Sequence, residues 1–127
     1  MRKTALLSLV AFALALAAGV YAAEKEATLE GTLVDSKCYL ADNENVGNDH
    51  MAVKQCGTLC LKGGQPGALL TKDKKFYPIL APSIALAPYV GQTVRVRGTL
   101  HSGAILAKKV EVQQNGKWEE VKLGAMM

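Results

Sequence analysis

Three cysteines follow an apolar N-terminal segment, and their odd number limits how this chain can be stabilised. They are Cys38, Cys56 and Cys60. In an oxidising compartment thiols normally end in disulfides, and therefore in pairs. Three thiols cannot pair off within one chain. One thiol must stay free or join a second chain, or a metal ion must hold the set.

The N-terminal segment predicts export. A basic start precedes a nearly unbroken apolar run over residues 5–18, which is shorter than the roughly 20 residues of a membrane-spanning helix. Small residues suited to cleavage end at Ala22. We therefore expect a signal peptide over residues 1–22, a single mature domain over residues 23–127, no stable membrane insertion, and a periplasmic or secreted location.

The charge balance excludes one class of partner. The chain has 15 basic and 11 acidic residues, and Arg2 and Lys3 belong to the predicted signal peptide, which leaves 13 basic residues. So small an excess, spread along the chain, is not typical of a nucleic-acid-binding surface, and we expect no nucleic-acid partner. No Ser-His-acid or Cys-His-acid arrangement stands out, and we expect no enzymatic activity.

Alternating apolar and polar residues predict a mainly β fold. Strands are expected over 28–35, 68–71, 76–80, 92–100, 104–113 and 117–123, with a short helix over 83–87. This is the element order of an OB-type barrel. We predict a small OB-like five-stranded barrel with a cysteine-bearing helical insert at about 36–66, after strand 1, and a short helix before strand 4. An unrelated small meander or sandwich is the alternative.

Within the insert, residues 40–48 are polar and predict a surface loop. Asn48 or Asp49 can then cap a helix over residues 50–62, which Gly63 ends. Asp49, like Asp35 at the end of the first strand, is expected to have an ordinary capping or solvated role.

The spacing of the last two cysteines suits a metal better than a mutual disulfide. Cys56 and Cys60 are four residues apart, so on a helix their Cβ atoms lie about 5–6 Å apart, whereas a disulfide needs about 3.8 Å. Two sulfurs bound to one metal ion can be well over 3 Å apart. Cys38 is far enough away in sequence to fold back onto them.

The two histidines are the candidate nitrogen ligands. On a regular helix His50 is rotated about 120° away from the face of Cys56, so it joins the site only if the helix begins irregularly. His101, at the turn between the fourth and fifth strands, is the candidate extra ligand, because in OB-type barrels that turn and the loop after strand 1 flank one binding face.

Three hypotheses remain open for the insert. The first is a structural disulfide of Cys38 with Cys56 or Cys60, in a module that binds a periplasmic protein or a glycan without metal. The second is a site of three thiolates and one imidazole, where zinc would be structural and copper would make the protein a carrier. The third is thiol–disulfide chemistry at Cys56 and Cys60. The oligomeric state is left undetermined.

The insert resembles a known pattern. Gly31, Asp35, Cys38 and Tyr39, followed by His50-x5-Cys56-x3-Cys60-x3-Gly64-x-Pro66, are similar to a group of small, uncharacterised exported bacterial proteins. The resemblance implies secretion, an OB-like barrel with a cysteine-bearing insert, and a metal or redox role for Cys38, His50, Cys56 and Cys60. Taken together, we predict an exported protein that binds copper or zinc through these four residues.

Overall fold

Five strands close into a barrel in the computed structural model, which describes residues 24–124; the predicted signal peptide lies outside the described residues. The barrel strands are β1 (Lys25–Asp35), β2 (Gly67–Thr71), β3 (Phe76–Leu80), β4 (Thr93–His101) and β5 (Ala104–Gln114). Neighbours in the order β3-β2-β1-β4-β5 pair antiparallel, and a parallel pairing of β3 with β5 closes the ring. The predicted OB-like five-stranded barrel is confirmed.

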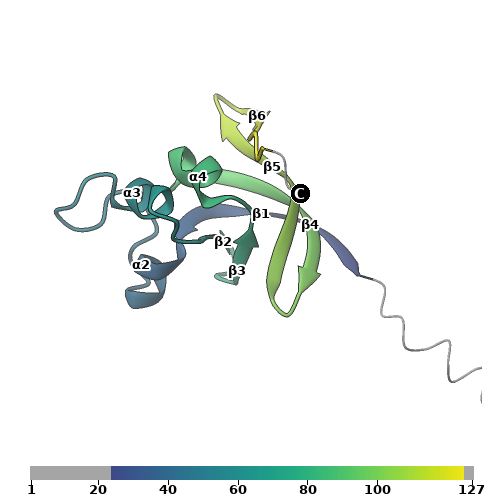
Figure 1. Cartoon of the computed structure of the whole chain (residues 1–127), viewed down its shortest axis with the longest axis horizontal. Coiled ribbons are helices and arrows are strands. Elements are labelled where there is room, and N and C mark those ends of the chain that lie inside the picture. Colours follow the sequence, from purple (N-terminus) through teal and green to yellow (C-terminus); the bar gives the residue numbers. More distant parts are fainter. Residues whose placement is uncertain (1–23, 125–127) are drawn as a thin grey trace, which may run out of the picture.

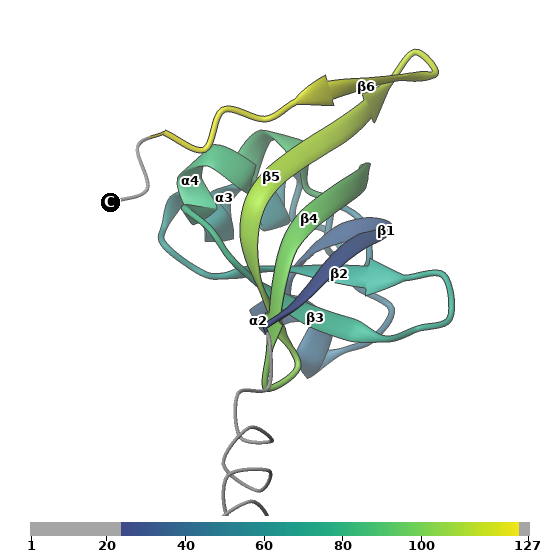
Figure 2. The same ribbon diagram turned by 90° about the vertical axis from the view of Figure 1, so that its right-hand side faces the viewer.

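The long first strand takes part in two pairings. Residues 25–32 pair with β4, and residues 31–35 pair with β2. An additional outer strand, β6 (Lys117–Glu120), pairs with β5 across the turn at Asn115-Gly116. Figure 2 shows the β5–β6 hairpin extending past the barrel strands. β6 ends three residues earlier than the sequence pattern predicts.

The predicted alternation of apolar and polar residues correctly identifies which side chains of the strands face the core. Val94 and Val96 on β4 are fully buried, while Arg97 on the same strand is exposed. Side chains from all five barrel strands meet in this core, together with Leu61 and Leu86 from the helical segments. Burial of this apolar surface is the main driving force for closing the barrel.

Short helices occupy both predicted positions. After β1 come α2 (Ser36–Ala41) and α3 (Cys56–Lys62); before β4 come α4 (Ser83–Leu86) and the 3-10 helix η1 (Ala87–Tyr89). Figure 1 shows α2, α3 and α4 gathered at one end of the barrel. The chain between β1 and β2 is therefore a helical insert, as predicted.

The predicted helix over residues 50–62 is wrong in its first half. His50 and Val53 instead exchange two backbone hydrogen bonds of 3.0 and 2.9 Å, which makes a tight turn. Met51 and Gln55 have positive φ angles of 50° and 53°, which a right-handed helix cannot include. The helix consequently begins at Cys56.

The helix α2 was not predicted, because six residues are too few to show a helical period. Its capping residue is Asp35, whose Oδ1 accepts a hydrogen bond of 3.0 Å from the backbone amide of Lys37. Asp35 is thus the N-cap of a helix that the sequence analysis did not predict. The expected solvated role is wrong, because the side chain is fully buried.

Asn48 and Asp49 satisfy the first amides of α3 from outside the helix. The Asn48 carbonyl accepts from the amide of Gly57 (2.9 Å), and its side-chain Oδ1 accepts from the amide of Thr58 (2.8 Å). Asp49 Oδ1 accepts from the amide of Gln55 (2.8 Å). The N-cap of α3 is Gln55, so the prediction that Asn48 or Asp49 is the N-cap is wrong, although both residues accept hydrogen bonds from amides at the start of the helix.

The two helices of the insert belong to different hydrophobic clusters. Leu61 of α3 is fully buried in the main core. Tyr39 of α2 packs in a smaller cluster with Val34, and its ring stacks on Phe76 at a centroid distance of 5.5 Å. Each helix is thus held to the barrel by its own apolar contacts.

Gly57 is required where α3 approaches η1. A Cβ atom at this position would lie 2.5 Å from Val90 Cγ1, and we expect Gly57→Ala to lower the free energy of unfolding by about 1–3 kcal/mol through overpacking. Gly63→Ala is the matched control at the other end of α3. There the nearest atom would be 3.4 Å away, and a change within about 0.5 kcal/mol is expected.

Urea unfolding followed by circular dichroism measures both changes. The double variant Gly57→Ala/Val90→Ala should recover part of the loss, because the clashing methyl group is removed. Equal stability of Gly57→Ala and the unmodified protein would contradict the close approach.

Candidate metal centre

Three thiols from two helices converge at one end of the barrel. Cys38 lies on α2, and Cys56 and Cys60 lie one turn apart on α3. Their sulfur atoms all lie within 4.8 Å of one another, and all three thiols are free and partly buried. The structure therefore brings together the three cysteines that the sequence singled out.

Asp35 and His50 form a second cluster with Cys38. One carboxylate oxygen, one ring nitrogen and the Cys38 sulfur also lie within 4.8 Å of one another. Asp35 is fully buried, and His50 is 5% exposed. Because Cys38 belongs to both clusters, it joins the three thiols to the carboxylate and the imidazole, and the residues Cys38, Cys56, Cys60 and His50 lie close enough together to hold a metal ion.

His50 reaches the site because the helix does not include it. The tight turn between His50 and Val53 removes the rotation that a regular helix over residues 50–62 would impose. The irregular beginning on which the role of His50 depended is thus observed.

The imidazole of His50 is oriented by the backbone. Its Nε2 lies 3.0 Å from the carbonyl oxygen of Gly47, and since a carbonyl only accepts, Nε2 must be the protonated nitrogen. Nδ1 is buried and has no hydrogen-bond partner within residues 24–124. Histidines that bind metals usually donate from their second nitrogen to a carbonyl or carboxylate in this way.

Asp35 presents a second acceptor without a partner. Its Oδ1 caps α2, whereas its Oδ2 is buried and unpaired in the described part of the chain. A buried polar atom left without a partner costs about 1–3 kcal/mol. A cation bound beside the thiols would satisfy both of these acceptors.

The surroundings keep two of the thiols protonated when no metal is bound. Burial raises the pKa of Cys38 to about 11, with a further contribution from Asp35. For Cys60 the pKa is raised to about 12, and the largest cause is hydrogen bonding of the thiol to the carboxylate of Asp35, followed by burial. Burial and the neighbouring carboxylate both disfavour the thiolate form, so these cysteines are poor nucleophiles in the metal-free protein.

Asp35 is the site residue that sequence reasoning missed. It precedes Cys38 by three residues and is the N-cap of α2, and capping-box geometry brings the side chains at the N-cap and N3 positions together. In the sequence, an N-cap aspartate followed by a cysteine at N3 could have marked Asp35 as a site residue. A capping role alone, however, is enough to explain an aspartate at this position.

His101 belongs to neither cluster. It is the last residue of β4, and its Nε2 lies 2.8 Å from the hydroxyl oxygen of Thr99. Figure 1 shows the β4–β5 turn lying apart from α2 and α3. The structure thus unites four of the five predicted ligand candidates.

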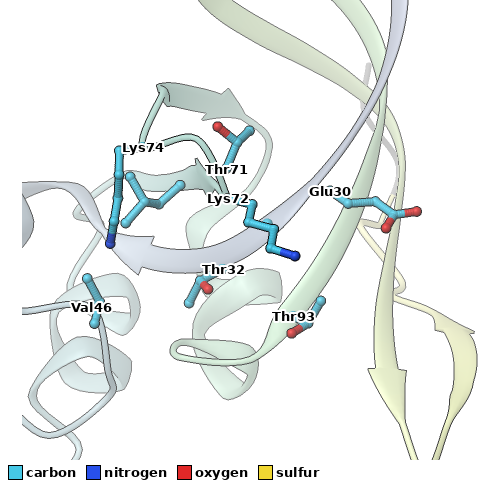
Figure 3. Close-up of a pocket in the computed structure, with 9 residues that line it drawn as sticks. Glu30, Thr32, Val46, Thr71, Lys72, Lys74 and Thr93 are labelled. Atoms are coloured by element: carbon cyan, nitrogen blue, oxygen red, sulfur yellow. The ribbon is translucent and has the colours of Figure 1, made fainter.

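A separate pocket of about 450 Å³ lies on the barrel, outside the thiol cluster. In Figure 3, Lys72 and Lys74 extend from the β2–β3 turn across β1, with the hydroxyl groups of Thr32 and Thr93 nearby. Glu30, also in the lining, is paired with Arg95 at 2.7 Å. This pocket has a cationic rim and no metal-binding side-chain set.

Comparisons with protein-family models, curated proteins and solved structures give no significant match. Within residues 24–124, no helix has the length and apolar character to cross a membrane.

The raised pKa values predict slow alkylation. At pH 8 a thiol with a pKa of about 11 is ionised in roughly one molecule per thousand, so we expect Cys38 and Cys60 in the reduced, metal-free protein to react with iodoacetamide at least about 50-fold more slowly than in urea. Because ionisation increases up to the raised pKa, the rates should still be rising at pH 10. Site-resolved mass spectrometry measures them.

Asp35→Asn is the informative variant in the same assay. Removing the carboxylate charge should accelerate alkylation of Cys60 more than that of Cys38, for which burial is the larger cause. Rates in the folded protein within threefold of those in urea would contradict the described environment.

Proposed function

We propose that this exported protein binds one copper or zinc ion per chain through the thiolates of Cys38, Cys56 and Cys60 and the imidazole of His50. The observation that carries the proposal is that two of the three buried side-chain atoms without a partner in residues 24–124, His50 Nδ1 and Asp35 Oδ2, belong to residues that cluster with Cys38 of the three-thiol group; the third is the hydroxyl of Ser36. A protein interior rarely leaves such atoms unsatisfied without a ligand or water.

The donor types fit both metals. Thiolates and imidazoles are the usual zinc ligands, with Zn–S near 2.3 Å and Zn–N near 2.0 Å, and soft thiolates also select Cu⁺. The three sulfurs lie within 4.8 Å of one another, and a nitrogen of His50 lies within 4.8 Å of the sulfur of Cys38, which the two clusters share.

The thiols are only partly buried, which favours exchange of the ion with a partner. A copper or zinc carrier in the periplasm, or outside the cell, would need this access. The partners implied are a metal ion and an exported protein that delivers or receives it. We propose no catalytic role.

Metal analysis of the mature protein tests the proposal. Protein purified without chelator should contain about one copper or zinc per chain, and three thiols should be titrated only after denaturation. Cys60→Ser and His50→Ala should each lower affinity for the bound metal by more than about 10-fold, since even outer partners of metal ligands contribute 10–100-fold.

His101→Ala is the control and should leave the affinity unchanged, because His101 is outside both clusters. Competition with a chromophoric chelator gives the affinities. A single free thiol, one disulfide and no retained metal after reduction and reloading would reject the proposal.

The pocket on the barrel favours a second candidate function, that of a binding module without metal. Lys72 and Lys74 line the pocket, and in the described chain the ion pair of their turn joins Lys75 to Asp73 instead. Two ammonium groups with nearby hydroxyls suit an anionic group on a protein or glycan.

Nuclear magnetic resonance tests the second candidate. On addition of an acidic oligosaccharide, the amide signals of Thr32 and Thr93 should shift, and Lys72→Gln/Lys74→Gln should weaken binding at least about threefold, because two attractive charges are lost. Lys117→Gln/Lys122→Gln carries the same charge change away from the pocket and should have no local effect. Equal weakening by both double variants would indicate only non-specific attraction.

A further inference from the structure

Asp35 has a combination of features that capping alone does not explain. It is fully buried, and only one of its two oxygens is used by the amide of Lys37. Asparagine or serine would cap α2 equally well with no charge to bury. A buried carboxylate without a compensating cation or hydrogen bonds is strongly unfavourable.

Asp35 and His50, which belong to one ligand cluster, each have a buried side-chain atom without a hydrogen-bond partner in the described residues. Asp35, Cys38 and His50 present their ligand atoms within 4.8 Å of one another, and both Asp35 Oδ2 and His50 Nδ1 are buried without partners in the described residues. In neutral His50, Nδ1 is an acceptor and cannot satisfy the carboxylate oxygen of Asp35. A positive centre beside Cys38 would satisfy both and would also neutralise the thiolates.

The chemistry of this second triad differs from that of the three thiols. Three sulfurs alone suit soft Cu⁺, whereas carboxylate oxygen, imidazole nitrogen and thiolate together suit a borderline divalent ion. Each additional anionic ligand also favours the ion with the higher charge. A carboxylate ligand at Asp35 would therefore influence which metal ion the site binds more tightly.

We propose that Asp35 is a metal ligand and that its carboxylate makes the site select a divalent ion, Zn²⁺, over Cu⁺. This inference rests on the proposed metal-binding function and names the metal. Asp35 takes a coordination position next to Cys38, so that an ion bound at Cys38 has an oxygen donor as well as sulfur and nitrogen donors.

If Asp35 is not a metal ligand and only influences the neighbouring thiols, the predicted change in metal affinity has the opposite sign. If the carboxylate only opposes ionisation of the thiols beside it, replacing it should increase affinity for any metal, because thiolates would form more easily. If it is a ligand, replacing it should decrease affinity for Zn²⁺. The sign of the change therefore separates the two roles.

Competition titrations of Asp35→Asn with chromophoric chelators for Zn²⁺ and, under anaerobic reducing conditions, for Cu⁺ test the inference. Asparagine retains the cap of α2, and circular dichroism of the metal-free variant checks its fold. We expect Zn²⁺ affinity to decrease at least about 10-fold, and Cu⁺ affinity to change less than threefold or to increase. Asp35→Ser, which also keeps a capping oxygen, should give the same result.

Ser36→Ala is the matched control, since Ser36 is a buried neighbour of Asp35 whose hydroxyl is not among the usual protein ligands of Zn²⁺, and it should leave both affinities within threefold. Unchanged or increased Zn²⁺ affinity in Asp35→Asn, or an equal decrease for both ions, would overturn the inference while leaving the metal-binding function intact. Failure of the unmodified protein to bind either ion would overturn both.

Discussion

The arrangement of the site depends on Asn48. Its backbone carbonyl and its side chain accept hydrogen bonds from the first amides of α3, and the hydroxyl of Thr58 lies 3.0 Å from Asn48 Oδ1 and 2.9 Å from the carbonyl oxygen of Ala87. Asn48 joins the insert loop to the cysteine-bearing helix, and Thr58 of that helix joins it in turn to Ala87 of η1. These contacts set where α3 begins, and consequently where Cys56 and Cys60 point and where the preceding turn leaves His50.

The barrel supplies the frame and the insert supplies the chemistry. Strand β1 ends in Asp35, which is at once the last strand residue, the cap of α2 and a member of the second ligand cluster. The position of the carboxylate is therefore determined by backbone pairing, since Asp35 pairs with Gly67 of β2. A site anchored in this way on regular structure is held more firmly than one built on loops alone.

The barrel could be predicted from the sequence because its signals are local and repeated. Alternation at Val94 and Val96, and the Asn115-Gly116 turn, each indicate their element without reference to the rest of the chain. The insert lacks such signals. The turn between His50 and Val53 and the positive φ of Gln55 produce no repeating pattern of apolar residues, and a helix of six residues is too short to be periodic.

Within the site, the three cysteines and His50 could be identified by residue type, whereas Asp35 could not. A capping aspartate and a ligating aspartate look the same in a sequence. Only its complete burial and its unpaired oxygen distinguish them, and both are properties of the folded chain.

The two helices that carry the thiols are packed in separate hydrophobic clusters, α3 through Leu61 and α2 through Tyr39. An ion shared by Cys38 and the thiols of α3 would bridge these clusters directly. It would act as a short cross-link within a small domain, which is the role that disulfides have in many exported proteins. Unlike a disulfide, such a link would form and dissolve with the supply of metal, without transfer of electrons.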